Sequence, residues 1–301
     1  MKPKVSIGVC VRNSAITLPE MIKSIKCQDY SHDWMEIIFI DDGSTDDTLS
    51  IIKDHVSILG IPARVFHTSW RGLGHARNMV VDNAEGEYIL WVDGDMVLSK
   101  CFLRKLVEFM EKNPEVGIAK GKQCLDSGGN LLATLESHSR AVGRMVDYDS
   151  ESAQSKSLGT GGSIYRTEAI RQAGGFDGNL RGYGEDFDME IRVKTVGWKL
   201  RVVDVDFLDY ERRGLTWKKL WQRYWLRGYY THYFLHKNRG LLKHYRMLPP
   251  VAFVTGLLHA HKLFSLTKQR TIFLLPLEYL LKMSAWYIGF VRSHSDSYEP
   301  R

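Results

Sequence analysis

Short apolar runs alternate with helical patterns over the first hundred residues, and this alternation restricts the chain to few folds. The runs cover 5–11, 36–40, 63–67 and 87–92. The segments between them place apolar residues at the three- and four-residue spacing of an amphipathic helix. Strands that alternate with helices in this way form a mostly parallel, doubly wound sheet with helices on its faces. We therefore predict an α/β fold.

An acidic motif, Asp93-Gly94-Asp95, directly follows the fourth predicted strand. Ligands of open α/β sheets bind beyond the carboxyl ends of the strands. Two carboxylates one residue apart can hold a divalent cation there, and the glycine between them lets the backbone turn and a phosphate approach. Such a motif is also common in plain polar turns. Its position after a buried strand favours a metal site at Asp93 and Asp95.

A second acidic pair, Asp41-Asp42, ends the second predicted strand. A carboxylate at this place can accept hydrogen bonds from a nucleobase or a ribose hydroxyl. The alternative is helix capping, with Ser44 or Asp46 accepting hydrogen bonds from the free N–H groups of the next helix. Both can hold, because the residues of the motif need not share one role.

Two further charged positions lie at predicted helix starts. Arg77 stands near the beginning of a helix, where a helix N-terminus and a guanidinium suit a diphosphate. The alternative is an ordinary surface arginine. Glu185 and Asp186 open a later helix, and a carboxylate there can act as a general base toward a hydroxyl. The alternative is that these acidic residues only stabilise the first helical turn.

The motifs in their order resemble the family 2 glycosyltransferases, which have the nucleotide-sugar-binding GT-A fold. The segment FIDDGSTDDT at 39–48 is highly characteristic of that family, and the resemblance extends over residues 4–210. It implies a Rossmann-like, mostly parallel sheet with flanking helices. The first strand departs from the usual family form, because residues 11–13 are Val-Arg-Asn where a Pro-Thr-Tyr-Asn type of ending is common.

The resemblance also implies roles for individual residues. Asp42, with Asp41 beside it, contacts the nucleoside. Asp93 lies near the ribose and, together with Asp95, holds Mg²⁺ or Mn²⁺ on the diphosphate. Asp186 is the general base. Other residues implied to line the nucleotide, diphosphate or acceptor are Arg77, Glu185, Gly161 and Gly162.

A cluster of Gln, Arg and Trp carries a second resemblance, to cellulose-synthase-like members of the family. Their interfacial helix places an arginine at the diphosphate and a tryptophan at the acceptor. Gln222, Arg223 and Trp225 form a compressed version of that cluster, and Arg227 is a competing diphosphate ligand. The alternative is an amphipathic helix whose Arg and Trp side chains only anchor it at a membrane surface.

Two apolar stretches near the C-terminus predict membrane helices. The stretch 272–291 is long enough to span a bilayer, and its only charges are Glu278 and Lys282, which can pair four residues apart. The stretch 248–264 is shorter, so one span, two spans or an interfacial helix all stay open. The alternative is a helical hairpin buried in the protein.

The predicted organisation follows from these patterns. It has a GT-A catalytic domain at 1–210, interfacial helices at 211–247, a membrane hairpin at 248–292 and a tail at 293–301. A hairpin keeps the catalytic domain and the tail on one side of the cell membrane. The Lys and Arg residues before the hairpin favour the cytoplasmic side.

The net charge is +6, from 41 Lys and Arg against 35 Asp and Glu, and it allows nucleic acid, an anionic membrane or a phosphorylated substrate as a partner. Much of the surplus lies between Arg212 and Arg246, which favours lipid headgroups and a diphosphate. No nucleic-acid-binding motif is present. None of the four cysteines forms a CxxC pair, so we expect reduced thiols rather than a zinc site or a redox dithiol.

The sequence thus predicts an inverting, metal-dependent glycosyltransferase with a nucleoside diphosphate sugar donor and a lipid-linked acceptor, such as a polyprenyl or dolichyl phosphate glycan. GDP-mannose is the favoured donor, because small membrane-bound family members often build lipid-linked mannosyl glycans. A UDP-glucose- or UDP-GlcNAc-dependent polysaccharide or glycolipid synthase is the alternative. A nucleotidyltransferase is less favoured, because residues 10–13 lack a GxGxR loop. The full set of carboxylates argues against a non-catalytic sugar-nucleotide-binding module.

Overall fold

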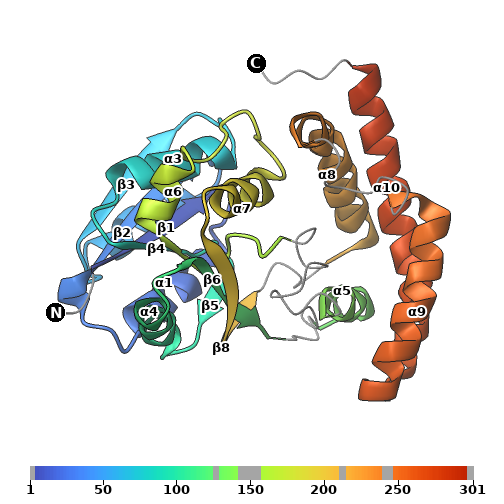
Figure 1. The fold of residues 1–301 in the computed structure, drawn as a ribbon, viewed down its shortest axis with the longest axis horizontal. Helices are drawn as coiled ribbons and strands as arrows, with labels where there is room; N and C mark the ends of the chain where they lie inside the picture. Colours follow the sequence, from blue (N-terminus) through green and yellow to red (C-terminus); the bar gives the residue numbers. More distant parts are fainter. Residues whose placement is uncertain (1–3, 125–128, 142–156, 210–214, 239–246, 297–301) are drawn as a thin grey trace. The chain divides into compact units, whose positions relative to one another are not determined.

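The chain divides into two compact units, which are described separately below (Figure 1). The computed structural model describes residues 4–124, 129–141, 157–209, 215–238 and 247–296. The first unit contains 1–124, 148–181 and 185–210, and the second contains 125–147, 182–184 and 211–301. Two segments that the sequence assigned to the catalytic domain, 125–147 and 182–184, therefore belong to the second unit.

The first unit is built on one eight-stranded sheet with the order β3-β2-β1-β4-β7-β6-β8-β5. The predicted parallel arrangement is confirmed for β1, β2, β3 and β4. The sheet as a whole is mixed, because β7 runs antiparallel to both β4 and β6, and β5 runs antiparallel to β8. The strands are β1 Val5–Val11, β2 Met35–Asp42, β3 Ala63–Thr68, β4 Tyr88–Trp91, β5 Met96–Leu98, β6 Val116–Gln123, β7 Ser163–Arg166 and β8 Lys199–Asp209.

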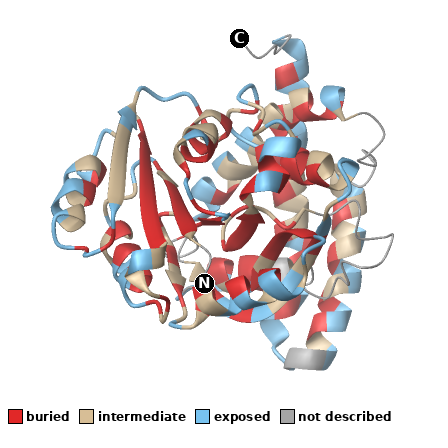
Figure 2. Ribbon diagram, turned by 60° about the vertical axis from the view of Figure 1, so that its left-hand side comes forward, coloured by how far each residue is buried: buried red, intermediate tan, exposed pale blue. Residues whose placement is uncertain are grey.

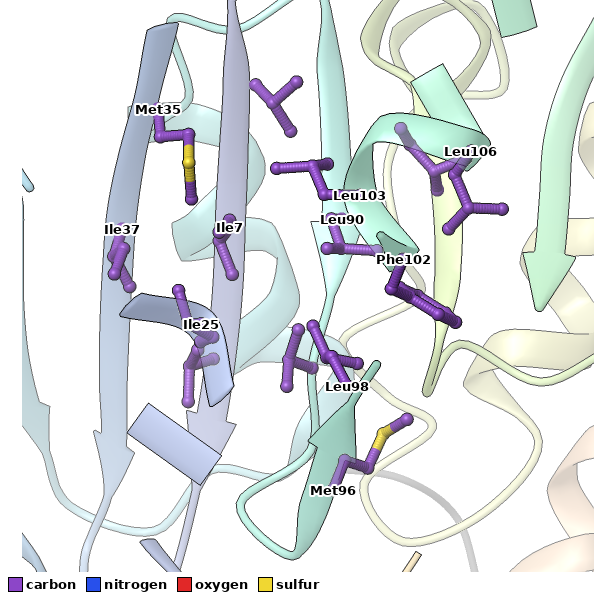
Figure 3. Close-up of a cluster of buried hydrophobic side chains, with 14 of the residues drawn as sticks. Ile7, Ile25, Met35, Ile37, Leu90, Met96, Leu98, Phe102, Leu103 and Leu106 are labelled. Carbon is purple, nitrogen blue, oxygen red and sulfur yellow. The ribbon is translucent and has the colours of Figure 1, made fainter. Parts of the chain in front are cut away.

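Helices cover both faces of this sheet, as an apolar central strand requires. All eight residues of β2 are buried, and Figure 2 shows the buried centre of the sheet. One core packs α1 and α4 against the sheet and includes Ile25 and Phe102 (Figure 3). The other core includes Val80 of α3, Ile170 of α6 and Met189 of α7. The helices are α1 Leu18–Lys26, α2 Thr48–Val56, α3 Leu73–Asn83, α4 Phe102–Lys112, α6 Thr167–Gln172 and α7 Glu185–Thr195, with a short 3₁₀ helix, η1, at His32–Trp34.

The second unit is helical. Its long helices α8 and α10 touch at two glycines: a Cβ atom added at Gly228 would lie 1.9 Å from the carbonyl oxygen of Trp286, and one added at Gly289 would lie 2.1 Å from that of Trp225. Only glycine permits such close backbone contact. The elements are α5 Leu131–Ala141, α8 Trp217–Lys237, α9 Pro249–Thr267, the 3₁₀ helix η6 Arg270–Leu274 and α10 Leu275–Ser295.

The charged pair of α10 is buried within this unit. Lys282 Nζ lies 2.7 Å from Glu278, which confirms their predicted pairing, and also 2.8 Å from Glu136 and 2.9 Å from Ser139 Oγ of α5. Among the described residues, no helix combines the length and the apolar character needed to cross a bilayer. The predicted membrane hairpin at 248–292 is therefore not supported. Apolar residues of α9 and α10 instead pack between helices, as the alternative of a buried hairpin anticipates.

Candidate active site

The carboxylate of Asp42 shapes a loop at the end of β2. It accepts hydrogen bonds from the backbone N–H groups of Arg71 (2.8 Å) and Gly72 (2.9 Å), which follow β3. The side chain is buried, so these contacts are protected from water. Asp42 thus fixes the chain that leads into α3, and its predicted contact with a nucleoside stays a prediction.

Asp41 has a structural role that the sequence did not predict. It is fully buried, and its carboxylate accepts hydrogen bonds from the backbone N–H (3.1 Å) and the hydroxyl of Ser44. It also contacts Nδ1 of His67 on β3 at 2.8 Å. Asp46, in turn, accepts a hydrogen bond from the Thr48 N–H at the start of α2 (3.1 Å), as the capping alternative predicts. Asp41 therefore ties β2 to its neighbours, and its predicted role beside the nucleoside stays a prediction.

The end of β1 lies against the same motif. The side-chain oxygen of Asn13 accepts a hydrogen bond from Thr45 N–H (2.8 Å), while Asn13 N–H donates to Ser44 Oγ (2.9 Å). The guanidinium of Arg12 lies over the ring of Trp70, 5.3 Å from its centroid. Trp70 is 43% exposed and immediately precedes the amides held by Asp42. Sequence reasoning missed this exposed aromatic residue, since it belongs to no motif.

The Asp93-Gly94-Asp95 motif forms the turn between β4 and β5, and both carboxylates are half-buried. Asp93 lies against a glycine-rich stretch, residues 157–162, which we call the glycine segment. A Cβ atom added at Gly161 would lie 2.2 Å from Asp93 Oδ2. The described residues hold no group of three or more His, Cys, Asp or Glu arranged for a metal. Two carboxylates nevertheless fit Mg²⁺ or Mn²⁺ that completes its shell with phosphate oxygens and water.

Asp186 borders the glycine segment from another side. It lies in the first turn of α7, is half-buried, and accepts a hydrogen bond from the Phe187 N–H at 2.7 Å. A Cβ atom added at Gly159 would lie 3.5 Å from Asp186 Oδ2. The fold therefore brings Asp93 and Asp186, 93 positions apart in the sequence, to one short stretch of backbone. Gly162, the other predicted glycine, has a φ of +73° and packs on Phe207.

Arg77 and Glu185 form a buried ion pair with each other. Burial lowers the pKa of the guanidinium, but Glu185, Asp186 and Asp93 outweigh it, so the pKa is raised. Burial also raises the pKa of Glu185 to about 7, although Arg77 opposes this shift. The pair joins α3 to the start of α7, and the predicted diphosphate role of Arg77 and acceptor role of Glu185 stay predictions.

The predicted cluster on α8 lies in the second unit. Gln222 is exposed, and Arg223 is half-buried. Trp225 stacks on Tyr229 with ring centroids 5.3 Å apart. Arg227 lies over two aromatic rings, with its guanidinium 5.6 Å from the centroid of Tyr183 and 5.0 Å from that of Tyr224. The expected contacts of this cluster with a diphosphate or an acceptor stay predictions.

The sequence profile of glycosyl transferase family 2 matches residues 6–172, which is more than half of the chain. The chain belongs to this family. The predicted family and the predicted class of enzyme, a glycosyltransferase, are confirmed.

Individual relatives agree with this membership. Poly(ribitol-phosphate) β-N-acetylglucosaminyltransferase TarS of Staphylococcus aureus is 32% identical over 110 residues, covering 36% of this chain and 19% of TarS. Poly-β-1,6-N-acetyl-D-glucosamine synthase of Staphylococcus epidermidis is 24% identical over 215 residues, covering 71% of this chain and 49% of the synthase. The chain thus spans less than half the length of these two relatives.

Solved structures show the fold. Mannosyltransferase PcManGT from Pyrobaculum calidifontis, in complex with GDP-Man and Mn²⁺, has a TM-score of 0.63 and 19% identity, covering 99% of this chain and 89% of PcManGT. TarS in complex with UDP-GlcNAc has a TM-score of 0.53 and 16% identity, covering 99% of this chain and 93% of the TarS chain. The predicted GT-A-like α/β fold with flanking helices is confirmed, with a mixed rather than mostly parallel sheet.

Proposed function

We propose that this chain transfers a sugar from a nucleoside diphosphate sugar to a hydroxyl group of a glycan, with inversion at the anomeric carbon. The observation that carries the proposal is the convergence of Asp93 and Asp186 on the glycine segment. One carboxylate suits the metal-bound diphosphate of the donor and the other suits the acceptor hydroxyl. Asp186 lies at Gly159 and Asp93 at Gly161, so the two carboxylates can act on the acceptor and the donor within one reaction site.

The chemistry follows from these positions. The Asp186 carboxylate takes the proton of the acceptor hydroxyl, whose oxygen forms a bond to the anomeric carbon on the face opposite the diphosphate. The bond from that carbon to the diphosphate oxygen breaks, and the nucleoside diphosphate leaves with the electron pair. A divalent cation held by Asp93 and Asp95 would neutralise charge on the diphosphate. The backbone of the glycine segment, which has no Cβ at Gly159 and Gly161, lets both carboxylates come close.

For the donor, we propose UDP-GlcNAc, with GDP-mannose as the second candidate. The two relatives described above are named for N-acetylglucosamine transfer or synthesis, and one of them is 32% identical over the matched region. Another relative, 36% identical over 105 residues, is named a cholesterol galactosyltransferase. PcManGT supports GDP-mannose, but through a likeness of fold at 19% identity. The weight of sequence similarity therefore moves the preference away from the mannosyl donor that the sequence patterns favoured.

The donor is tested by the release of nucleoside diphosphate. The protein is incubated with UDP-GlcNAc, GDP-mannose or UDP-glucose, each with Mg²⁺ or Mn²⁺ and a membrane lipid extract. We expect UDP to be released from UDP-GlcNAc, and this release to stop when a chelator removes the metal. The sugar in the product should have the anomeric configuration opposite to that in the donor. Retained configuration would contradict the inverting mechanism, and absence of release from all three donors would contradict the proposed function.

For the acceptor, we propose a lipid-linked glycan at an anionic membrane surface on the cytoplasmic side. An apolar face on α9, η6 and α10 supports this proposal. Its exposed members are Val254, Leu257, Leu258, Phe273, Leu274, Leu277, Tyr287, Ile288 and Val291. Lys262, Lys268 and Arg270 are exposed around the turn between α9 and α10, whereas the acidic Glu278 is buried. Apolar residues flanked by basic ones match an anionic lipid surface.

Vesicle binding tests the membrane proposal without any sugar donor. We expect the protein to sediment with vesicles that contain phosphatidylglycerol and less with pure phosphatidylcholine vesicles. Replacing Leu257 and Leu258 by Glu should abolish sedimentation, whereas Ile58→Glu, at a site that is 70% exposed in the first unit, should not. Equal sedimentation of both variants would contradict the proposal, as would dimerisation in solution that the Leu257/Leu258 change abolishes.

A further inference from the structure

Two side chains of opposite charge hydrogen-bond to the backbone of the same two residues of the glycine segment, Leu158 and Gly159. One is the buried Glu190 and the other is the half-buried Lys120. Glu190 on α7 accepts hydrogen bonds from the N–H groups of Leu158 (2.9 Å) and Gly159 (2.7 Å) and from Ser157 Oγ (2.9 Å). The ammonium of Lys120 on β6 donates to the carbonyl oxygens of Leu158 (2.5 Å) and Gly159 (3.3 Å). The N–H groups and the carbonyl oxygens of these two residues are therefore held by different elements of the fold, α7 and β6.

We call Glu190 and Lys120 the clamp. The glycine segment lies against the two candidate reactive carboxylates, Asp186 and Asp93, at Gly159 and Gly161, within or just after the residues that the clamp holds. Gly159 has a φ of +75°, and its missing Cβ would lie 3.3 Å from Lys120 Nζ and 3.5 Å from Asp186 Oδ2. Two residues later the backbone of Gly161 lies against Asp93. A turn closes the stretch, because Ser163 Oγ donates to the carbonyl oxygen of Gly159 at 2.7 Å. A shift of the backbone at Leu158 or Gly159 would therefore directly change the contacts with Asp186 and Asp93.

Charge links the clamp to the same carboxylates. Burial raises the pKa of Glu190 to about 7, and Asp186 adds to that rise while the bonds from Leu158, Ser157 and Gly159 oppose it. Burial lowers the pKa of Lys120, and the carboxylates of Glu190, Asp93 and Asp186 oppose that shift. The carboxylates of Glu190, Asp93 and Asp186 therefore stabilise the ammonium form of Lys120, whereas Asp186 disfavours the ionised form of Glu190.

We infer that Glu190 and Lys120 are positioning residues, which fix the backbone of Leu158 and Gly159 so that the glycine segment meets Asp93 and Asp186 in the geometry needed for transfer. The inference rests on the proposed function for its effect on rate. Neither residue belongs to a motif in the sequence, and neither contacts the donor or the acceptor hydroxyl in the proposed mechanism.

The test compares Glu190→Gln and Lys120→Met with Asp188→Asn. Asp188 is a buried carboxylate on the same helix that pairs with Arg192 (2.7 Å), so its loss is a matched control for stability. We expect both clamp variants to lower kcat roughly 10- to 100-fold, because misplacement of reactive groups acts on the transition state. Asp188→Asn should lower Tm and leave kcat unchanged.

Two further measurements keep the inference falsifiable. Gly159→Ala strains the same backbone without removing a charge, and it should lower kcat in the same way. Hydrogen exchange at Leu158 and Gly159 should accelerate in Glu190→Gln while that of α7 stays slow. If the clamp variants lose Tm but keep wild-type kcat and exchange, the two residues are only structural and the inference is overturned. If the wild type transfers no sugar, the proposed function fails, and the exchange rates still decide whether the clamp exists.

Discussion

The backbone of Gly161 lies against the carboxylate of Asp93, so that a Cβ atom at position 161 would come within 2.2 Å of Asp93 Oδ2. A Cβ atom does not come this close to a non-bonded oxygen, so one of the two groups would have to move. The side chain that is expected to bind the metal therefore owes its position partly to the absence of a side chain on another loop.

Gly161→Ala should displace Asp93 and weaken metal-dependent donor binding. We expect a loss of roughly 100-fold in kcat/KM, in line with the effect of small misplacements at reactive centres. Gly178→Ala is the control, because a Cβ atom there would meet nothing within 4 Å. Calorimetric titration of the donor with Mn²⁺ measures the effect, and equal affinity in the two variants would contradict the predicted contact.

Asp186→Asn should retain donor binding and lose transfer. The amide keeps the shape of the side chain but cannot take a proton, and general bases contribute on the order of 100- to 10,000-fold to rate. Donor affinity by titration and turnover by nucleoside diphosphate release separate the two effects. Full transfer by a variant with an intact donor site would show that Asp186 is not the base.

Glu185→Gln should destabilise the fold, because it leaves the buried guanidinium of Arg77 without its charged partner. Breaking a buried pair from one side costs about 3–5 kcal/mol. Urea unfolding measures this cost, and Lys4→Met is the control: its ion pair with Glu85 is at the surface and should contribute little. If Glu185→Gln unfolds at the same urea concentration as the wild type, the Arg77–Glu185 ion pair does not stabilise the fold.

The stability of the second unit should fall as pH rises. Burial raises the pKa of Glu278 from 4.5 to about 8, with Lys282 opposing and Glu136 adding to the shift. Because the folded pKa lies above the unfolded one, the stabilising contribution is complete below the ordinary carboxyl pKa and is lost as pH passes through about 8. The Lys282 ammonium that pairs with Glu278 also lies over the rings of Tyr279 and Tyr224.

Melting curves from about pH 6 to about pH 9 test this dependence. The Tm of the wild type should fall more over that interval than the Tm of Glu278→Gln, in which the group no longer titrates. Glu168→Gln, at an exposed site on α6, should behave like the wild type. Identical pH profiles for the wild type and Glu278→Gln would rule out Glu278 as the titrating group.

The local pattern of the sequence predicted the first half of the sheet closely, since the run at 5–11 is the observed β1. It also located Asp93 and Asp186, because strand ends and helix starts are local features. It did not show that Asp41 and Arg77 are occupied by internal partners. A charged residue at a strand end or a helix start looks the same in sequence whether it faces a ligand or, like Arg77 of α3, a carboxylate 108 positions away.

The same limit explains the C-terminal helices. An apolar stretch of about 20 residues suits a membrane and a helix bundle equally well. Lys282 is buried against Glu136, 146 positions earlier in the chain, as in a helix bundle, and no local pattern contains that contact. Lys120 and Glu190 escaped notice for the same reason, since the backbone they hold lies 38 and 32 residues away.

The reciprocal contacts of Gly228 and Gly289 have a mechanical consequence. Each glycine forms a notch that receives the main chain of the opposite helix, so α8 and α10 cannot slide or rotate past each other without a collision. We therefore expect the two helices to move together as one rigid body. Truncation of the chain before α10 would remove the helix that packs against Gly228 and α8. Any C-terminal truncation should therefore be confined to residues after 295.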